Sequence, residues 1–158
     1  RPGPAMRKLA KSLPGDPDTT LDRLHVLSRL ITEQVRYDVG ATHVATSGEE
    51  AAAEGHGVCQ DHAHILLGLA RQMGLPARYV SGYLLIDGQI DQEASHAWAE
   101  VHIDNLGWVG FDPSNGISPD ERYVRVATGL DYAEAAPISG VTYGGGEETL
   151  LVTLQVQQ

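Results

Sequence analysis

The chain carries a single cysteine, Cys59, in a setting that suits a nucleophile. It follows the segment Gly55–Gly57 and stands at the start of a predicted helix, which ends near Met73 before Gly74 and Pro76. A helix N-terminus carries partial positive charge that favours thiolate over thiol, and glycines let a substrate carbonyl approach the sulfur closely. The free N–H groups of a first helical turn can also bind an oxyanion. The segment therefore has the parts that acyl transfer through a thiol requires.

The same position also fits a purely structural role for the thiol. Cys59 begins an apolar stripe that continues through Ala63, Leu66, Ala70 and Met73, and such a stripe packs against a protein core. Lone cysteines are common as small buried hydrophobic residues, and one cysteine cannot form an internal disulfide. The helix pattern alone favours this structural role, so a catalytic role depends on further residues.

A nucleophilic thiol needs a base, and the base needs a group that orients it. His96 begins one predicted strand, His96–Ile103, and Asp112 ends the next, Trp108–Asp112, with a turn at Asp104–Gly107 between the two. Counting outward from that turn leaves His96 and Asp112 displaced by a few residues rather than opposite each other. We therefore expect sheet twist or a bulge to bring them together.

The elements that must position these residues follow a simple order, with helices first and strands afterwards. The spacing of apolar residues and capping signals predicts helices over Pro4–Leu13, Thr20–Val35, Glu49–Glu54 and about Cys59–Met73. Alternation and β-branched content predict further strands over Arg78–Ile86, Tyr123–Ala127 and Thr149–Val156. This order indicates an α+β fold, in which N-terminal helices pack on an antiparallel sheet.

Composition narrows the possible partners and the location. The chain has 158 residues, enough for one domain, and a formal net charge of −10. A surface this acidic repels phosphate backbones and anionic lipids, so we expect neither nucleic acid nor membrane as a partner. No apolar stretch is long enough to span a bilayer. The scarcity of cysteine is compatible with the cytoplasm, where we place the protein, without arguing against export.

Four ordered segments carry a resemblance to a known family. They are Gly55–Asp61, Gly74–Tyr83, His96–Val101 and Gly107–Ser114. Together they resemble the core of the transglutaminase-like superfamily, and more narrowly its bacterial members that are described as predicted cysteine proteases. The resemblance extends from about Leu21 to Ser114, and the segments Gly129–Tyr132 and Ala136–Gly140 are similar to that group's C-terminal strands.

The resemblance implies a papain-like α+β fold with a Cys-His-Asp triad and no cofactor. Cys59 would be the nucleophile, His96 the general base and then the acid, and Asp112 the group that orients the imidazole. The implied reaction is acyl transfer at an amide through a thioester, with peptide or amide hydrolysis of a peptide or protein substrate as the first expectation. Two alternatives stay open: a protein-glutamine transamidase or deamidase, and a non-catalytic binding module that retains the fold.

Further residues are candidates for the oxyanion site and for substrate contacts. They are Gly57, Val58, Gln60, Tyr37 and Trp98. Animal transglutaminases have a tryptophan upstream of the cysteine that helps to hold the oxyanion, whereas both tryptophans of this chain lie downstream of Cys59. Tyr37 is the upstream aromatic residue that could replace it. Trp98 and Trp108 are more simply explained as aromatic residues that pack in the core or the hairpin.

Two other polar groups are expected to have no catalytic role. His56, Asp61, His62 and His64 cluster in sequence, but they lack the spacing of a His-Glu-x-x-His or cysteine-pair metal site, so we expect no metal. Asp61 suits the first turn of a helix as an acidic residue. Glu100 and His102 alternate with the inward residues of their strand and are expected to face solvent.

The resemblance also bears on domain organisation. We expect residues 1–158 to form one transglutaminase-like catalytic domain. Bacterial relatives of this type usually carry a β-rich region before the core, which this sequence lacks. We therefore expect the chain to be a C-terminal fragment of a longer protein.

Overall fold

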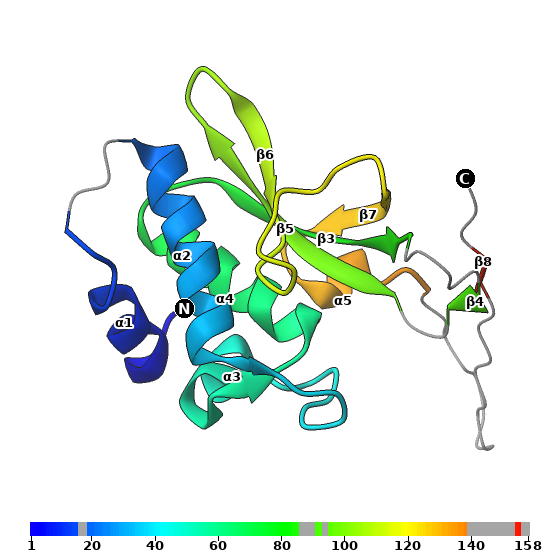
Figure 1. Ribbon diagram of the computed structural model, residues 1–158, viewed down its shortest axis with the longest axis horizontal. Coiled ribbons are helices and arrows are strands. Elements are labelled where there is room, and N and C mark those ends of the chain that lie inside the picture. The colour runs from blue at the N-terminus through cyan, green and yellow to red at the C-terminus, as the bar shows by residue number, and fades with distance from the viewer. Residues whose placement is uncertain (16–18, 86–90, 93–94, 139–153, 156–158) are drawn as a thin grey trace.

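The computed structural model describes residues 1–15, 19–85, 91–92, 95–138 and 154–155, and it places helices beside one antiparallel sheet (Figure 1). The helices are α1 (Pro4–Lys11), α2 (Thr20–Gln34), α3 (Gly48–Glu54), α4 (Cys59–Gln72) and α5 (Tyr132–Ala135). The strands are β1 (Arg36–Tyr37), β2 (His56–Gly57), β3 (Ala77–Leu84), β4 (Asp91–Gln92), β5 (His96–Ile103), β6 (Gly107–Phe111), β7 (Tyr123–Gly129) and β8 (Leu154–Gln155). The predicted α+β class is confirmed.

Local sequence signals account for the ends of the helices. The side chain of Thr19 accepts a hydrogen bond from the Asp22 N–H at the start of α2. Ser47 and Glu50 form the predicted capping box of α3, and Gly55 ends that helix in the left-handed conformation with a φ of 75°. Within the described residues, no helix is both long and apolar enough to cross a membrane.

The central sheet has the strand order β6-β5-β3-β7, and all its neighbours are antiparallel. One face of β5 is apolar and packs against α4, which forms the middle of the core. The buried residues on this face of β5 are Ala97, Ala99, Val101 and Ile103. Because side chains alternate along a strand, His96, Trp98, Glu100 and His102 lie on the other face. The sheet therefore separates the α4 core from a second layer of side chains.

The predicted strand boundaries differ slightly from the observed ones. The strand predicted to end at Ile86 runs over Ala77–Leu84, and the one predicted over Trp108–Asp112 runs over Gly107–Phe111. Most of the strand predicted over Thr149–Val156 lies outside the described residues. Its described part, β8, pairs antiparallel with β4.

Glu100 is not solvent-facing, so that prediction was wrong. Its side chain is buried on the outer face of the sheet, where it accepts a hydrogen bond of 2.7 Å from Arg78 Nε and one of 3.1 Å from Arg125 Nη1. Strands β3, β5 and β7 bring these three residues side by side. Two guanidinium groups thus compensate for burial of the carboxylate.

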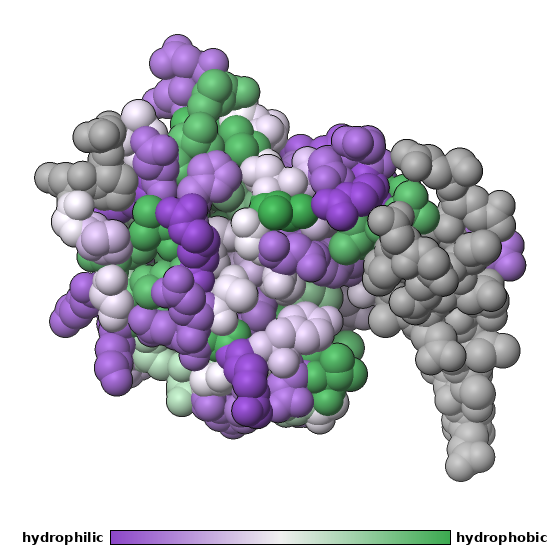
Figure 2. Space-filling model, viewed as in Figure 1, coloured by the Kyte–Doolittle hydropathy of each residue, from purple (hydrophilic) through white to green (hydrophobic). Residues whose placement is uncertain are grey.

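Trp108 packs in the hairpin, which is one of the two positions predicted for it, and its ring stays partly exposed. Trp108 is 45% exposed, and its ring packs under the Arg78 guanidinium at 4.2 Å and edge-on to His102. His102 is accordingly half-buried. Figure 2 shows hydrophobic side chains along this β5–β6 hairpin and hydrophilic ones over much of α2.

We expect the substitution Glu100→Gln to lower the free energy of unfolding by about 2 kcal/mol, the scale of hydrogen bonds to a charged group. The loss should follow because Arg78 and Arg125 keep their charges while their shared partner becomes neutral. Urea unfolding of the wild type and the variant measures it. Glu33→Gln on α2, which removes an exposed carboxylate, is the control, and equal losses in both variants would contradict the role of the ion pairs.

Candidate active site

The start of α4 places Cys59 at the end of a short, tightly packed segment. Strands β1 and β2 pair in parallel, with Tyr37 opposite Gly57, and the chain then turns into the helix at Val58. The Asp61 carboxylate accepts a 2.8 Å hydrogen bond from the Val58 N–H. A Cβ at position 57 would lie 2.8 Å from that carboxylate, so only glycine fits here. The side chain of Cys59 is 9% exposed.

His96 and Asp112 meet across β5 and β6 without any irregularity in their pairing. The register pairs Ala99 with Phe111 and continues evenly toward the turn. Extended past the end of β6, it sets Trp98 opposite Asp112, so His96 is the diagonal neighbour on the same face. Of the two devices expected to bring these residues together, a bulge is absent from the pairing of β5 with β6. The observed bulge lies between β3 and β7, at Ser81 and Gly82.

The imidazole of His96 lies between the thiol and the carboxylate. His96 Nε2 is 2.6 Å from Asp112 Oδ2. Asn115 Nδ2 lies 3.4 Å from the same nitrogen. Interaction with Cys59 also raises the pKa of this ring, and Nδ1 is the nitrogen left to face the sulfur. The three residues proposed from the sequence therefore lie in one row, at the point where α4 and β5 both begin.

Asp112 is completely buried and accepts hydrogen bonds at both oxygens. Besides His96, Oδ2 accepts from Asn115 Nδ2 and from the Tyr123 hydroxyl, each at 2.7 Å. Oδ1 accepts from the backbone N–H groups of Ser114 and Asn115, at 3.0 and 3.3 Å. This number of donors holds the carboxylate ionised and fixed in orientation.

Opposing effects set the pKa values of this pair. Burial opposes the charged form of His96, but hydrogen bonds to Asp112 and Cys59 outweigh it and raise the pKa of the imidazole to about 9. Burial also works against the charged form of Asp112. Hydrogen bonds from His96, Asn115 and Tyr123 nevertheless hold the pKa of that carboxyl below its usual value. At neutral pH the pair is therefore an imidazolium and a carboxylate.

A second buried histidine ties the elements of the site together. His62 Nε2 donates to the Val35 carbonyl at 2.9 Å, and Nδ1 accepts from the Ser114 hydroxyl at 3.0 Å. Burial lowers the pKa of His62, which keeps it neutral and fits this donor–acceptor pattern. The Thr32 hydroxyl donates to the Pro113 carbonyl. The loop that carries Asp112 is thus bonded to both α2 and α4.

The additional residues expected at the site take different positions. Tyr37 is 48% exposed, and burial together with the nearby Cys59 and Asp112 raises the pKa of its hydroxyl, so it stands at the edge of the site. Trp98 is 2% exposed and stacks beside His96 at 6.3 Å, which places it behind the imidazole rather than at a substrate. The Gln60 amide donates to the Val44 carbonyl at 3.1 Å and is held against a loop.

The backbone at the start of α4 distinguishes the possible oxyanion donors. The Val58 N–H is already bonded to Asp61, so it is not available to a substrate. The N–H groups of Cys59 and Gln60 belong to the first helical turn, where no intrahelical acceptor exists.

Asp61 is buried and also accepts from the Thr42 hydroxyl at 2.6 Å. Among the described residues, no three potential ligands converge on a metal position.

Comparison with known proteins agrees with this arrangement. The family model of the transglutaminase-like superfamily matches residues 7–113, more than half of the chain. The chain belongs to this superfamily. A crystal structure of a candidate cysteine protease from Cytophaga hutchinsonii superposes with a TM-score of 0.76 at 29% sequence identity, covering 94% of this chain and 48% of that one.

Sequence relatives extend the comparison to other bacteria. The chain is 37% identical over 134 residues to an uncharacterized protein of Mycobacterium leprae, covering 82% of this chain and 47% of that protein. It is 31% identical over 107 residues to the protein-glutamine gamma-glutamyltransferase of Pseudomonas aeruginosa, covering 56% of this chain and 15% of that protein. The chain thus spans about half the length of its mycobacterial relatives, or less.

Some residues of the site were not identified from the sequence. Asn115 and Tyr123 donate to Asp112, but one lies in a turn and the other was assigned only to a strand. The three-residue interval from Asp112 to Asn115 was a usable signal, because an aspartate at the start of a turn often accepts from the backbone beyond it. His62 was weighed only as a metal ligand. Nothing in its sequence context indicates its bond to Ser114.

We expect the protein to lose stability as the pH rises from about 6.5 through 9. An unfolded histidine has a pKa near 6.5, whereas His96 has one of about 9, so its contribution is fully present below 6.5 and is lost above 9. Chemical unfolding at several pH values measures this slope. The variant His96→Gln should have a flatter slope, while His43→Gln, which replaces an exposed histidine, should keep it. Equal slopes in the wild type and His96→Gln would disprove the linkage.

Proposed function

We propose that this chain catalyses thiol-dependent acyl transfer at an amide bond, with hydrolysis of a peptide or amide as the outcome. The observation that carries the proposal is the row of Cys59, His96 and Asp112 at the start of α4, in which Asp112 is bonded to His96 and Cys59 raises the pKa of the imidazole. Thiolate and imidazolium stabilise each other in such a row, and the buried carboxylate stabilises the imidazolium. Membership of the transglutaminase-like superfamily and the structural likeness to a candidate cysteine protease support it.

The proposed reaction has two halves. The Cys59 sulfur attacks the amide carbonyl, and the first N–H groups of α4 bind the resulting oxyanion. His96 gives its proton to the departing amine as the C–N bond breaks, which leaves a thioester. A water molecule then gives a proton to His96 and its hydroxide attacks the thioester. The C–S bond breaks, which restores the thiolate beside the imidazolium, and the carboxylic acid product loses its proton to solvent. Asp112 holds the imidazole in place throughout.

A second outcome is transamidation, in which a primary amine takes the place of water. The 31% identity to the protein-glutamine gamma-glutamyltransferase of Pseudomonas aeruginosa favours it. Both outcomes share the thioester, so they differ only in the second half-reaction. Tyr37, at the edge of the site, is the side chain we propose to contact the incoming group or the oxyanion.

We expect Cys59 to react with iodoacetamide at pH 6.5 about tenfold faster than the same cysteine in the urea-unfolded chain, because the imidazolium of His96 and the start of α4 stabilise the thiolate. The chain has one cysteine, so the alkylation rate measured by mass spectrometry is unambiguous. The variant His96→Gln should abolish the acceleration. A folded chain that reacts no faster than the unfolded one would favour the non-catalytic binding module.

The reaction itself is tested by incubating a peptide library with the wild type and with Cys59→Ala, with and without a fluorescent primary amine. Mass spectrometry separates backbone cleavage, side-chain deamidation and amine incorporation. We expect Cys59-dependent cleavage or deamidation without amine, and thermal unfolding of Cys59→Ala close to that of the wild type. Products that do not depend on Cys59, or none at all, would refute the proposal.

We expect Asp112→Asn to retain the fold and to lose less turnover than the roughly 10⁴-fold that this change costs a Ser-His-Asp triad, because papain-like enzymes use asparagine in this role. Asp112→Ala should lose more, since it leaves His96 and Tyr123 without their acceptor. Turnover and melting temperature are measured together for both variants. If Asp112 only capped its turn, asparagine would substitute freely and alanine would cost stability rather than rate.

A further inference from the structure

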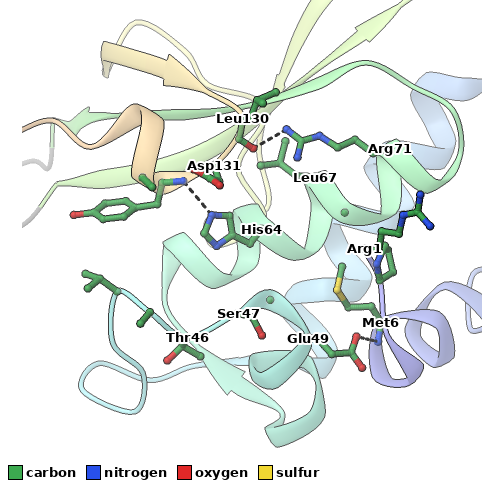
Figure 3. A pocket seen from close by; sticks show the side chains of 17 residues that line it. Arg1, Met6, Thr46, Ser47, Glu49, His64, Leu67, Arg71, Leu130 and Asp131 are labelled. Atoms are coloured by element: carbon green, nitrogen blue, oxygen red, sulfur yellow. Dashed lines mark hydrogen bonds between the residues drawn. The ribbon is translucent and has the colours of Figure 1, made fainter.

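A cavity of about 500 Å³ runs along α4, and neither Cys59 nor His96 lines it (Figure 3). Its floor is the stripe of α4 that carries His64, Leu67 and Arg71. One wall is the loop at Val44–Gly48, and the opposite wall is the segment Leu130–Ala133. In Figure 3 the cavity follows the helix from His64, nearer its beginning, to Arg71, near its end.

The end of this cavity nearest the nucleophile is held in place by hydrogen bonds. Gln60, the residue after Cys59, donates to the carbonyl of Val44, which lines the cavity. Asp61 holds the same loop through Thr42. The loop therefore wraps the first turn of α4 and joins the catalytic row to the cavity.

The first part of the cavity is apolar and open. Val44 on one wall and Leu130 on the other are 67% and 61% exposed. Leu67 and Tyr132 add apolar surface between them. His64 contributes no charge, because burial lowers its pKa and its Nε2 accepts the Tyr132 N–H at 3.3 Å. This part suits an apolar side chain of a bound peptide.

The far part of the cavity is basic in a chain with a formal net charge of −10. Arg71 is held by the carbonyls of Ala77 and Leu130, at 2.9 and 2.7 Å, so its guanidinium is fixed before any ligand binds. Arg1 lines the cavity beside it, and an adjoining hollow shares both arginines and adds Arg7.

Two carboxylates also line the cavity, and both are engaged with backbone groups. Glu49 accepts hydrogen bonds from three N–H groups at the start of α1, at Gly3, Ala5 and Met6. Asp131 accepts from the N–H of Glu134. These acids keep their charge, but neither lines the adjoining hollow, where Arg1, Arg7 and Arg71 are the charged groups that a ligand meets.

We propose, relying on the function proposed above, that this cavity binds the substrate on one side of the reacting amide and selects an apolar residue followed by an acidic one. Arg71 lies twelve residues after Cys59, about 18 Å along the helix axis. An extended peptide covers about 3.3–3.6 Å per residue, so the acidic residue lies about five positions from the reacting amide. The apolar residue lies two or three positions away, beside His64 and Leu67.

The test measures binding to the inert Cys59→Ala chain by fluorescence anisotropy. The probes are fluorescein-labelled peptides with a central glutamine, leucine at the second or third position from it and glutamate at the fifth, placed on either side. We expect one of the two directions to bind at least tenfold more tightly than its partner with lysine in place of glutamate. Equal binding of the two peptides in both directions, or no binding, would overturn the proposal.

Variants of the cavity complete the test. Arg71→Glu should reverse the preference for glutamate over lysine. Arg29→Glu changes an exposed residue of α2 that lines neither the cavity nor the adjoining hollow, and it should leave the preference unchanged. Leu130→Asp changes a 61% exposed side chain and should weaken binding at least tenfold with the fold intact. A preference that survives both Arg71→Glu and Leu130→Asp would overturn the proposal.

Comparing peptide binding by the Cys59→Ala chain with peptide turnover by the wild type distinguishes failure of the cavity proposal from failure of the proposed function. If the wild type processes peptides through Cys59 with no preference for the acidic residue, the cavity proposal fails and the catalytic one stands. If the Cys59→Ala chain discriminates the peptides while the wild type processes none, the binding site stands and the catalytic proposal fails.

Discussion

The hydrogen bond between the Asp112 carboxylate and the His96 imidazole is the contact on which the rest of the site depends. Complete burial of a carboxylate lowers the stability of the fold unless hydrogen-bond donors contact its oxygens. Asp112 is completely buried and has donors at both oxygens. Asn115, Tyr123 and two backbone N–H groups supply the pairing that the imidazole alone could not. The loop after β6 and the start of β7 are therefore folded around one carboxylate. Its charge in turn keeps His96 protonated up to a pKa of about 9.

The thiol reaches this pair only because α4 begins at a defined place. The Asp61 carboxylate closes the first turn against Val58 and occupies the space that a side chain at Gly57 would need. His62, one turn after Cys59, then bonds to Ser114 in the loop that carries Asp112. Cys59 and Asp112 are thus connected through the same helix. A shift of α4 along its axis would break the bonds that hold each of them.

The sequence was a good guide where the signal is local. The capping box at Ser47, the helix over Thr20–Val35 and the strand over His96–Ile103 each depend on neighbours within a few residues, and the structure has all three, with α2 ending at Gln34. Cys59, His96 and Asp112 were recognisable by type, spacing and family resemblance. The burial of Glu100 was not predictable, because alternation tells which face a side chain takes but not what covers that face. Its partners come from strands β3 and β7, which are distant in sequence.

Tyr123 was missed for the same reason, since its strand reaches Asp112 only through the order of the sheet.

The cavity along α4 relates the choice between water and amine to the direction in which a peptide lies. The half of the peptide that binds beside Arg71 can carry the reacting acyl group. That half then stays bound in the thioester, and the second half-reaction depends on which acceptor, water or amine, enters past Tyr37. If that half is the leaving group, its release empties the space beside Cys59, and an acceptor can approach from the same side. The first direction favours water, because a small molecule can reach a crowded thioester, whereas the second provides room for a primary amine. If the proposed function and the proposed cavity both hold, the direction of peptide binding is therefore the property that would separate hydrolysis from transamidation on this arrangement of residues.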